Sequence, residues 1–116
     1  MGTKKAWIYY RVANGDPEAV ENQKRELLNY AENNGYEVIG ESYDIGSGND
    51  INREGLNKAL TAVNDTLLIK DISRIGRDMS AIVKVLSILN KQGVKLISVD
   101  TGNIDINTIF PRIKNM

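Results

Sequence analysis

The chain has 116 residues and a mass of 12.9 kDa, with 41% hydrophobic and 26% charged residues, so its length and composition indicate one folded domain and exclude a disordered segment. Fifteen basic residues balance fifteen acidic ones, which means that a polyanion must be bound by a local cluster of charge. The absence of Cys and His excludes thiol nucleophiles, Cys/His zinc sites, disulfides and imidazole acid–base catalysis.

The first half of the chain predicts a strand, a helix and a second strand. Aromatic and β-branched residues at 6–12 run into turn formers at 13–17 and predict the first strand. A helix follows, because its positions recur every three or four residues before a left-handed stop at Gly35. These positions are Val20, Gln23, Lys24, Leu27, Leu28 and Ala31. A second strand is predicted at Tyr36–Glu41, and residues 44–50, rich in Gly and Asp, predict a mobile loop.

The second half of the chain alternates helices and strands. Apolar helical stripes run from Leu56 to Val63 and from Ile82 to Leu89, and strands are predicted at Thr66–Lys70 and Val94–Val99. Alternating strands and helices are typical of right-handed βαβ units, which predict an α/β fold with a mostly parallel sheet covered by helices.

The end of the chain predicts only a short element. We expect a single domain over residues 1–116, in which residues 103–116 are the start of a truncated helix that Pro111 prevents from continuing. The apolar positions Ile104, Ile106, Ile109 and Phe110 form a surface for pairing with another subunit or pack back onto the sheet.

Arginines gather where the predicted strands end. Four of the six arginines follow strands, namely Arg11, Arg53, Arg74 and Arg77, whereas the nine lysines are scattered. Ligands of parallel sheets bind beyond the carboxyl ends of the strands, and the arginine fork suits phosphate oxygens. The sequence therefore predicts an oxyanion or phosphodiester site. The alternative is that nearby acids neutralise these arginines, since Asp50, Asp71 and Asp78 lie close in sequence.

Two serines lie in the same loops as these arginines. Ser47 and Ser73 either donate hydrogen bonds to the ligand or act as caps and turn formers. No Gly-Lys-Ser/Thr run follows Gly46-Ser47-Gly48, and no dinucleotide fingerprint follows the first strand, so we expect no nucleotide cofactor. We expect no metal or other cofactor either.

Several motifs in this order resemble the catalytic domain of serine recombinases, the resolvase and invertase family. The motifs are Tyr10-Arg11-Val12, the Gln23 helix with Leu27, Asp44 to Gly48, Arg53 to Leu56, Ser73 to Asp78, and Gly93-Val94. The resemblance covers nearly the whole chain. It implies a three-layer domain with a central, mostly parallel sheet of four to five strands, and metal-free cutting and rejoining of DNA.

The resemblance also implies roles for individual residues. In this family a serine just after the Tyr-x-Arg-Val stretch attacks a phosphodiester, and arginines stabilise the charge on the phosphoryl group. By matching position, the phosphate-activating set is Arg11, Arg53, Arg74 and Arg77. Gln23 and Ser47 would line the same pocket, and Ser73 stands where many members have an aspartate.

The position of the nucleophile holds Ala13 in place of serine. A methyl group cannot attack phosphorus, so either this domain is inactive or another hydroxyl, with Ser47 the nearest candidate by loop, replaces it. We favour inactivity, because a replacement nucleophile must also align with the leaving oxygen.

Two function classes follow. The first is a site-specific recombinase domain that acts on DNA through a phosphoserine intermediate and is inactivated at Ala13. The second is a non-catalytic module that binds the DNA backbone or another recombinase subunit. Self-association is expected in either case, and a signalling receiver is a weaker third option because the first strand ends in arginine rather than an acidic metal-binding pair.

We expect the chain to work in the cytoplasm without a membrane partner. No apolar run approaches the roughly 20 residues that span a bilayer, and the N-terminus lacks a signal-peptide core. Residues after the last strand are too few for the helix-turn-helix module that many members carry, so specific DNA recognition is not expected in this chain alone.

Overall fold

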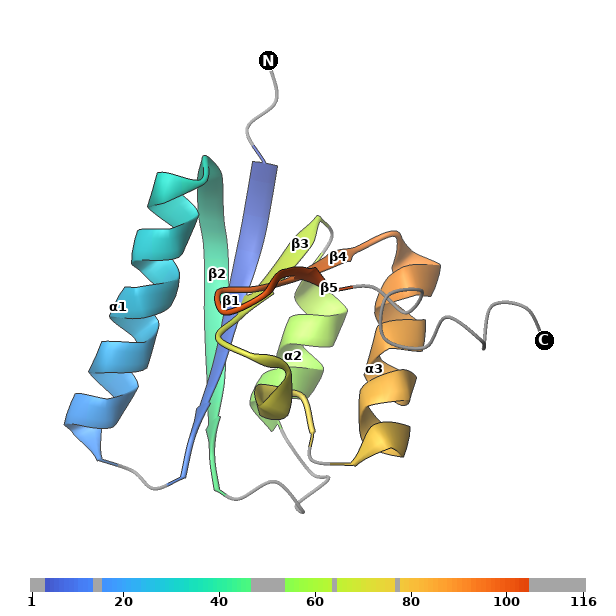
Figure 1. The fold of residues 1–116 in the computed structure, drawn as a ribbon, viewed down its shortest axis with the longest axis horizontal. Helices are drawn as coiled ribbons and strands as arrows, with labels where there is room; N and C mark the ends of the chain where they lie inside the picture. Colours follow the sequence, from blue (N-terminus) through green and yellow to red (C-terminus); the bar gives the residue numbers. More distant parts are fainter. Residues whose placement is uncertain (1–3, 14–15, 47–53, 64, 77, 105–116) are drawn as a thin grey trace.

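The computed structural model describes residues 4–13, 16–46, 54–63, 65–76 and 78–104 (Figure 1). Its elements are β1 (Lys4–Val12), α1 (Pro17–Asn33), β2 (Tyr36–Ile45), α2 (Glu54–Ala62), β3 (Thr66–Ile69), a 3-10 turn (Ile72–Arg74), α3 (Met79–Gln92), β4 (Lys95–Ser98) and β5 (Gly102–Ile104). The predicted strands and helices are present in the predicted order, and the 3-10 turn and β5 are additional.

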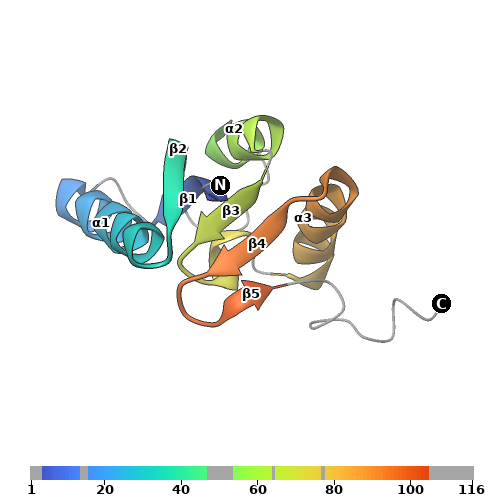
Figure 2. The same cartoon turned by 90° about the horizontal axis from the view of Figure 1, so that it is seen from above.

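The five strands form one sheet in the order β2-β1-β3-β4-β5. β1 pairs in parallel with β2 and β3, and β3 pairs in parallel with β4, whereas β5 runs antiparallel to β4. Seen from above, α1 lies on one face of the sheet and α2 and α3 lie on the other (Figure 2). The predicted α/β class, with three layers and a mostly parallel sheet of four to five strands, is confirmed.

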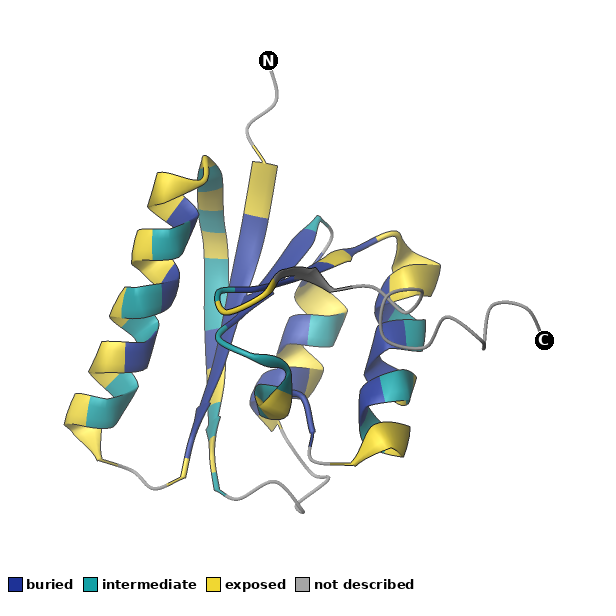
Figure 3. Ribbon diagram, viewed as in Figure 1, coloured by how far each residue is buried: buried dark blue, intermediate teal, exposed yellow. Residues whose placement is uncertain are grey.

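β1 is covered on both faces and is buried from Ala6 to Val12 (Figure 3). Trp7 and Tyr9 pack into a core with α2 and α3, while Ile8 and Tyr10 pack into a second core against α1. A strand that is buried on both faces is apolar throughout. This explains why the sequence shows a continuous apolar run here.

The helices begin and end at residues suited to these positions. Asp16 caps α1 by accepting a hydrogen bond from the amide of Glu18 at 3.0 Å, with Pro17 in the first turn. Gly93 ends α3 in the left-handed region, at φ 72°.

Over the described residues, none of the three α-helices has the length and apolar character needed to cross a membrane.

A bulge divides β2 between the two cores. Ala6 pairs with Val38 and Trp7 pairs with Gly40, so Ile39 is an extra residue in the strand. Val38 packs with α1, whereas Ser42, beyond the bulge, accepts a hydrogen bond from Trp7 Nε1 at 3.0 Å. A Cβ at Gly40 would lie 2.3 Å from the Trp7 ring, so this position requires glycine. Beyond the bulge β2 contacts α2, since Ser42 Oγ donates to the carbonyl oxygen of Gly55 at 2.7 Å.

β2 is longer than the sequence predicts. Asp44 and Ile45 were predicted to begin a mobile loop over residues 44–50, but they are the last residues of the strand and pair with Arg11 and Val12. Pairing with a buried strand overrides a local composition that favours a turn. The prediction is wrong for these two residues, and residues 47–50 lie outside the described residues.

The predicted helical start at residues 103–116 is wrong at its first two positions, which belong to β5. Ser98 Oγ accepts hydrogen bonds from the amides of Asp100 and Thr101, at 3.2 and 3.4 Å. The chain reverses there, and β5 pairs antiparallel with β4. Residues 105–116 lie outside the described residues, so the expected pairing surface stays a prediction.

A polar network ties β2 to α1. Tyr10 Oη donates to Glu41 Oε2 at 2.8 Å, and Glu41 Oε1 lies 3.1 Å from Lys24 Nζ. The ring of Tyr10 stacks on that of Tyr43, with 5.1 Å between the centroids. Burial raises the pKa of Tyr10 well above its ordinary value, and the hydrogen bond to Glu41 raises it further.

We predict that Tyr10 ionises only at strongly alkaline pH. Because its pKa is higher in the folded chain than in the unfolded chain, its stabilising contribution is complete below about pH 10 and is lost as the pH rises toward the folded value. An ultraviolet titration of phenolate should show a late component that Tyr10→Phe removes. A wild-type titration without such a component would contradict this assignment.

Candidate functional site

The carboxyl ends of β1, β2 and β3 meet at one edge of the sheet, because these strands run parallel (Figure 1). Arg11 and Val12 end β1, Ile45 ends β2, and Ile69 ends β3. Ligands of open α/β sheets bind beyond this edge. The predicted site residues are therefore expected to lie at this edge.

The guanidinium of Arg11 bridges two other strand exits. Its Nη1 donates to the carbonyl oxygen of Gly46 at 2.9 Å, and its Nη2 donates to that of Ser73 at 2.7 Å. Arg11 is 8% exposed. The structure thus brings Arg11 together with the segments that follow β2 and β3.

Gln23, predicted to line the pocket, lies against the backbone of Arg11. The amide of Arg11 donates to Gln23 Oε1 at 3.3 Å, and Gln23 Nε2 donates to the carbonyl oxygen of Arg11 at 3.1 Å. Ala13, at the predicted nucleophile position, follows the end of β1 and is exposed. The predicted nucleophile position is therefore accessible to solvent, next to a buried strand end.

Asp44 joins the end of β2 to the start of α2. Its Oδ1 accepts a hydrogen bond from the amide of Gly55 at 2.8 Å. Its Oδ2 accepts from the amide of Leu56 at 3.0 Å and from Tyr9 Oη at 2.8 Å. A carboxylate at a helix N-terminus is favoured by the helix dipole. Asp44 therefore fixes the start of α2, which begins at Glu54, the residue after Arg53.

The 3-10 turn after β3 carries Ser73 and Arg74, and Asp71 caps it. Asp71 Oδ1 accepts hydrogen bonds from the amide of Ser73, at 3.0 Å, and from Ser73 Oγ. Asp71 Oδ2 lies 3.8 Å from Arg74 Nη2, and the Arg74 side chain is 26% exposed. The alternative that a nearby acid neutralises each arginine therefore holds in part for Arg74. Such a pair contributes at most about 1 kcal/mol, which a phosphate can displace.

The other two acids of that alternative are Asp78 and Asp50, and the structure describes only Asp78. Asp78 caps α3, since its Oδ1 accepts from the amide of Ala81 at 2.8 Å and from Ser80 Oγ at 3.1 Å. The capping hydrogen bonds account for the position of the Asp78 carboxylate. Asp50 lies outside the described residues, so its pairing stays untested.

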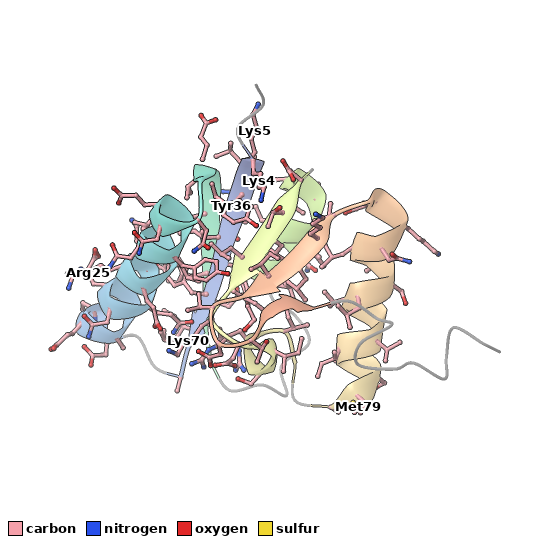
Figure 4. The ribbon with its side chains drawn as sticks, turned by 45° about the horizontal axis from the view of Figure 1, so that its top comes forward. Lys4, Lys5, Arg25, Tyr36, Lys70 and Met79 are labelled. Atoms are coloured by element: carbon pink, nitrogen blue, oxygen red, sulfur yellow. The ribbon has the colours of Figure 1, made fainter. Side chains whose placement is uncertain are left out.

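Sequence reasoning missed Lys70, which it grouped with the scattered lysines. Lys70, labelled in Figure 4, follows β3 at the same edge. Its Nζ donates to both carboxylate oxygens of Glu26, at 2.9 and 3.0 Å. This hydrogen bond raises the pKa of Lys70, so the side chain stays charged. Its position as the last residue of a predicted strand was the signal that could have identified it.

A hollow of about 360 Å³ lies beside the end of β2 and the start of α2. Its lining residues are Glu41, Ser42, Tyr43, Asp44, Glu54, Gly55 and Lys58. Three carboxylates and one ammonium group disfavour a phosphate there. No group of three or more acidic side chains that could hold a metal ion occurs in the described ranges.

Three of the predicted site residues lie outside the described residues, namely Ser47, Arg53 and Arg77. The described neighbours of two of them are in contact with this edge or close to it: Gly46 accepts from Arg11, and Gly76 follows the 3-10 turn. The structure thus describes Arg11, Ala13, Gln23, Ser73 and Arg74 at this edge. The placement of the other three stays a prediction.

A mostly parallel α/β sheet with Arg11 and Arg74 at its strand exits is the arrangement expected from the sequence resemblance. The family model described as the resolvase N-terminal domain matches residues 6–114. This chain belongs to the resolvase family of serine recombinases.

Solved structures similar to this chain agree with the family. The N-terminal catalytic domain of TP901-1 integrase is 25% identical over 97% of this chain and 95% of that chain, with a TM-score of 0.79. A resolvase family site-specific recombinase from Streptococcus pneumoniae is 28% identical over 97% and 82%, with a TM-score of 0.76. The C-terminal catalytic domain of ISC1926 TnpA, an IS607-like serine recombinase, is 33% identical over 82% and 68%, with a TM-score of 0.74.

We predict that Asp44→Asn destabilises the fold by about 1–3 kcal/mol. An asparagine replaces one acceptor oxygen by a donor that faces the amides of α2, and it removes the charge that favours the helix N-terminus. Urea unfolding followed by circular dichroism measures the change. Glu32→Gln, an exposed change near the end of α1, is the control, and equal midpoints for both variants would contradict the role of Asp44.

Proposed function

We propose that this chain is the catalytic domain of a site-specific recombinase whose substrate is DNA, and that Ala13 leaves it without strand-cleaving activity. The observation that carries the proposal is the bridging of three strand exits by Arg11, next to an exposed residue 13. Membership of the resolvase family supports DNA as the substrate. Such a protein works where its DNA lies, in the cytoplasm.

The proposed reaction explains which groups are needed. In an active member, a serine oxygen at position 13 forms a bond to phosphorus while the bond to a deoxyribose oxygen breaks, and the protein becomes linked to DNA through phosphoserine. The developing negative charge needs fixed cations nearby. We assign this role to the four arginines of the sequence prediction, Arg11, Arg53, Arg74 and Arg77, with no metal or other cofactor.

The remaining site residues have supporting roles in this proposal. Gln23 holds the backbone of Arg11 and so orients the end of β1. Ser73 donates its hydroxyl to Asp71 and is therefore engaged in capping the turn. Ser47 is assigned to the pocket by its place in the sequence. We propose inactivity because no serine stands at position 13 and because a replacement nucleophile must also align in line with the leaving oxygen.

A second candidate function rests on Ala13 itself. A domain that cannot cut DNA retains its phosphate-binding edge, so it can bind the DNA backbone or pair with an active recombinase subunit and modulate it. Phosphate contacts supply affinity without sequence information. This role needs only the single domain that we propose over residues 1–116.

We predict that Ala13→Ser restores covalent attachment to DNA. The unchanged chain should give no protein–DNA adduct with a pool of supercoiled plasmids that carry random inserts, whereas the variant should give an adduct that survives detergent. The double variant Ala13→Ser/Arg74→Ala is the control and should form much less. If Ala13→Ser forms no adduct, the binding module is the better assignment.

We also predict that Arg74→Ala weakens DNA binding by about tenfold at low salt and reduces the slope of log affinity against log salt concentration by about one. The physical reason is the loss of one phosphate contact. Fluorescence anisotropy with a short labelled duplex measures both quantities. Arg25→Ala on the outer side of α1 removes the same charge away from the site (Figure 4), and equal losses for the two variants would argue against a phosphate site at the strand exits.

A further inference from the structure

Lys70 lies at the strand exits, and the proposed function gives it no role. β3 ends at Ile69, so Lys70 leaves the sheet at the edge where Arg74 follows four residues later. We propose that Lys70 is a phosphate-binding residue of the DNA site, and that Glu26 occupies its ammonium group in the free protein, in the place that a DNA phosphate takes in the complex. This inference rests on the proposed function, which supplies the ligand.

The carboxylate of Glu26 binds Lys70 through both of its oxygen atoms. Lys70 Nζ donates to Glu26 Oε1 at 2.9 Å and to Glu26 Oε2 at 3.0 Å. A phosphate group offers an ammonium group the same kind of partner, namely charged oxygen atoms that accept short hydrogen bonds. Lys70 is therefore already engaged with an anion, and in the free chain this anion is a carboxylate of α1.

The two side chains of this ion pair are both partly exposed to water, 30% for Lys70 and 41% for Glu26. An ion pair of this kind contributes little to stability, because water and dissolved ions compete for both partners. The Glu26 carboxylate can return to water when another anion takes its place, and the four-carbon stem of a lysine is flexible enough to follow that anion. The pair can therefore open at low cost.

The main chain of Lys70 is held without Glu26. Its carbonyl oxygen accepts hydrogen bonds from Ser98 Oγ at 3.0 Å and from the amide of Asp100 at 3.1 Å. Ser98 is fully buried at the end of β4, so these contacts are protected from water. Exchange of Glu26 for another anion therefore moves side chains and leaves the strand ends in place.

The charges around Lys70 place it beside the arginine site. The hydrogen bond to Glu26 has the largest effect on the pKa of Lys70 and raises it, Asp100 raises it further, and Arg74 lowers it. Repulsion by Arg74 requires that its guanidinium lies near the Lys70 ammonium group. Each nucleotide of a DNA strand carries a phosphate, so a strand bound at Arg74 brings neighbouring phosphates toward Lys70.

The alternative is that the Lys70–Glu26 pair only joins α1 to the sheet. Other contacts already do this, since Leu27 and Ala31 are buried against the sheet and Gln23 binds the main chain at the end of β1. The ion pair is therefore not needed to hold α1. The two interpretations differ in what they predict for DNA binding, because a purely structural pair leaves the affinity for phosphate unchanged.

The first experiment measures binding of the chain to a short labelled duplex by fluorescence anisotropy at several salt concentrations. Lys70→Ala should weaken binding by about threefold to tenfold at low salt and reduce the slope of log affinity against log salt concentration by about one. Lys70→Arg keeps the charge and should bind like the wild type. Lys24→Ala is the matched control, because Lys24 has a similar exposure and also pairs with a glutamate. Equal losses for Lys70→Ala and Lys24→Ala would overturn the proposal.

The second experiment removes the competing carboxylate. Glu26→Gln should raise the affinity for the same duplex several-fold more than Glu32→Gln, an exposed change on the same helix with the same change in charge, because only Glu26→Gln frees Lys70. In a Lys70→Ala background the two glutamine variants should give the same affinity. Equal gains in the wild-type background, or a gain from Glu26→Gln that persists without Lys70, would overturn the proposal.

Arg74→Ala in the same assay separates Lys70 from the site as a whole. If Arg74→Ala weakens binding while the Lys70 and Glu26 variants behave like their controls, the proposed function stands and the role of Lys70 falls. If the wild type does not bind the duplex, both fall. Circular dichroism checks that each variant is folded. If Lys70→Ala does not fold, the comparison of Glu26→Gln with Glu32→Gln still decides.

Discussion

Parallel strands deliver the residues at their carboxyl ends to a single edge, and this chain carries positive charges there, which repel one another. In the described residues each such charge has fixed oxygen partners. Arg11 donates to two carbonyl oxygens, Arg74 lies beside the carboxylate of Asp71, and Lys70 donates to Glu26. The charges at this edge are therefore balanced within the protein, and the Arg74–Asp71 and Lys70–Glu26 pairs are both partly exposed.

The fold class could be predicted because strand and helix periodicities are local properties of the sequence. The boundaries of the strands and helices could not be predicted where contacts between distant residues decide them. Asp44 belongs to β2 because its carboxylate binds the start of α2, eleven and twelve residues later in the chain, while its neighbours favour a turn. β5 exists because Ser98 reverses the chain and offers a strand edge. Neither cause is visible in the spacing of apolar residues.

The sequence indicated which residue types lie at the candidate site, but it did not indicate which atoms they contact. Arginines at strand ends identified the right edge for Arg11 and Arg74, yet their partners depend on geometry. Arg11 binds oxygens that are 35 and 62 residues away in sequence, so sequence spacing gives no indication of them. Asp71 was recognised as a possible partner of Arg74 because the two lie close in sequence, and the 3-10 turn brings residues three apart onto one side.

Architecture and reactivity are separable at the end of β1. Arg11 is buried and makes contacts with α1, the segment after β2 and the turn after β3, whereas Ala13, two residues later, is exposed. A change from serine to alanine at such a position removes one oxygen atom and leaves the buried contacts of Arg11 in place. In the function proposed above, phosphoryl transfer needs the oxygen atom at position 13, and phosphate binding needs the contacts of Arg11. Under the proposed function, a chain with alanine at position 13 lacks the atom that cuts DNA and retains the buried contacts at the strand exits.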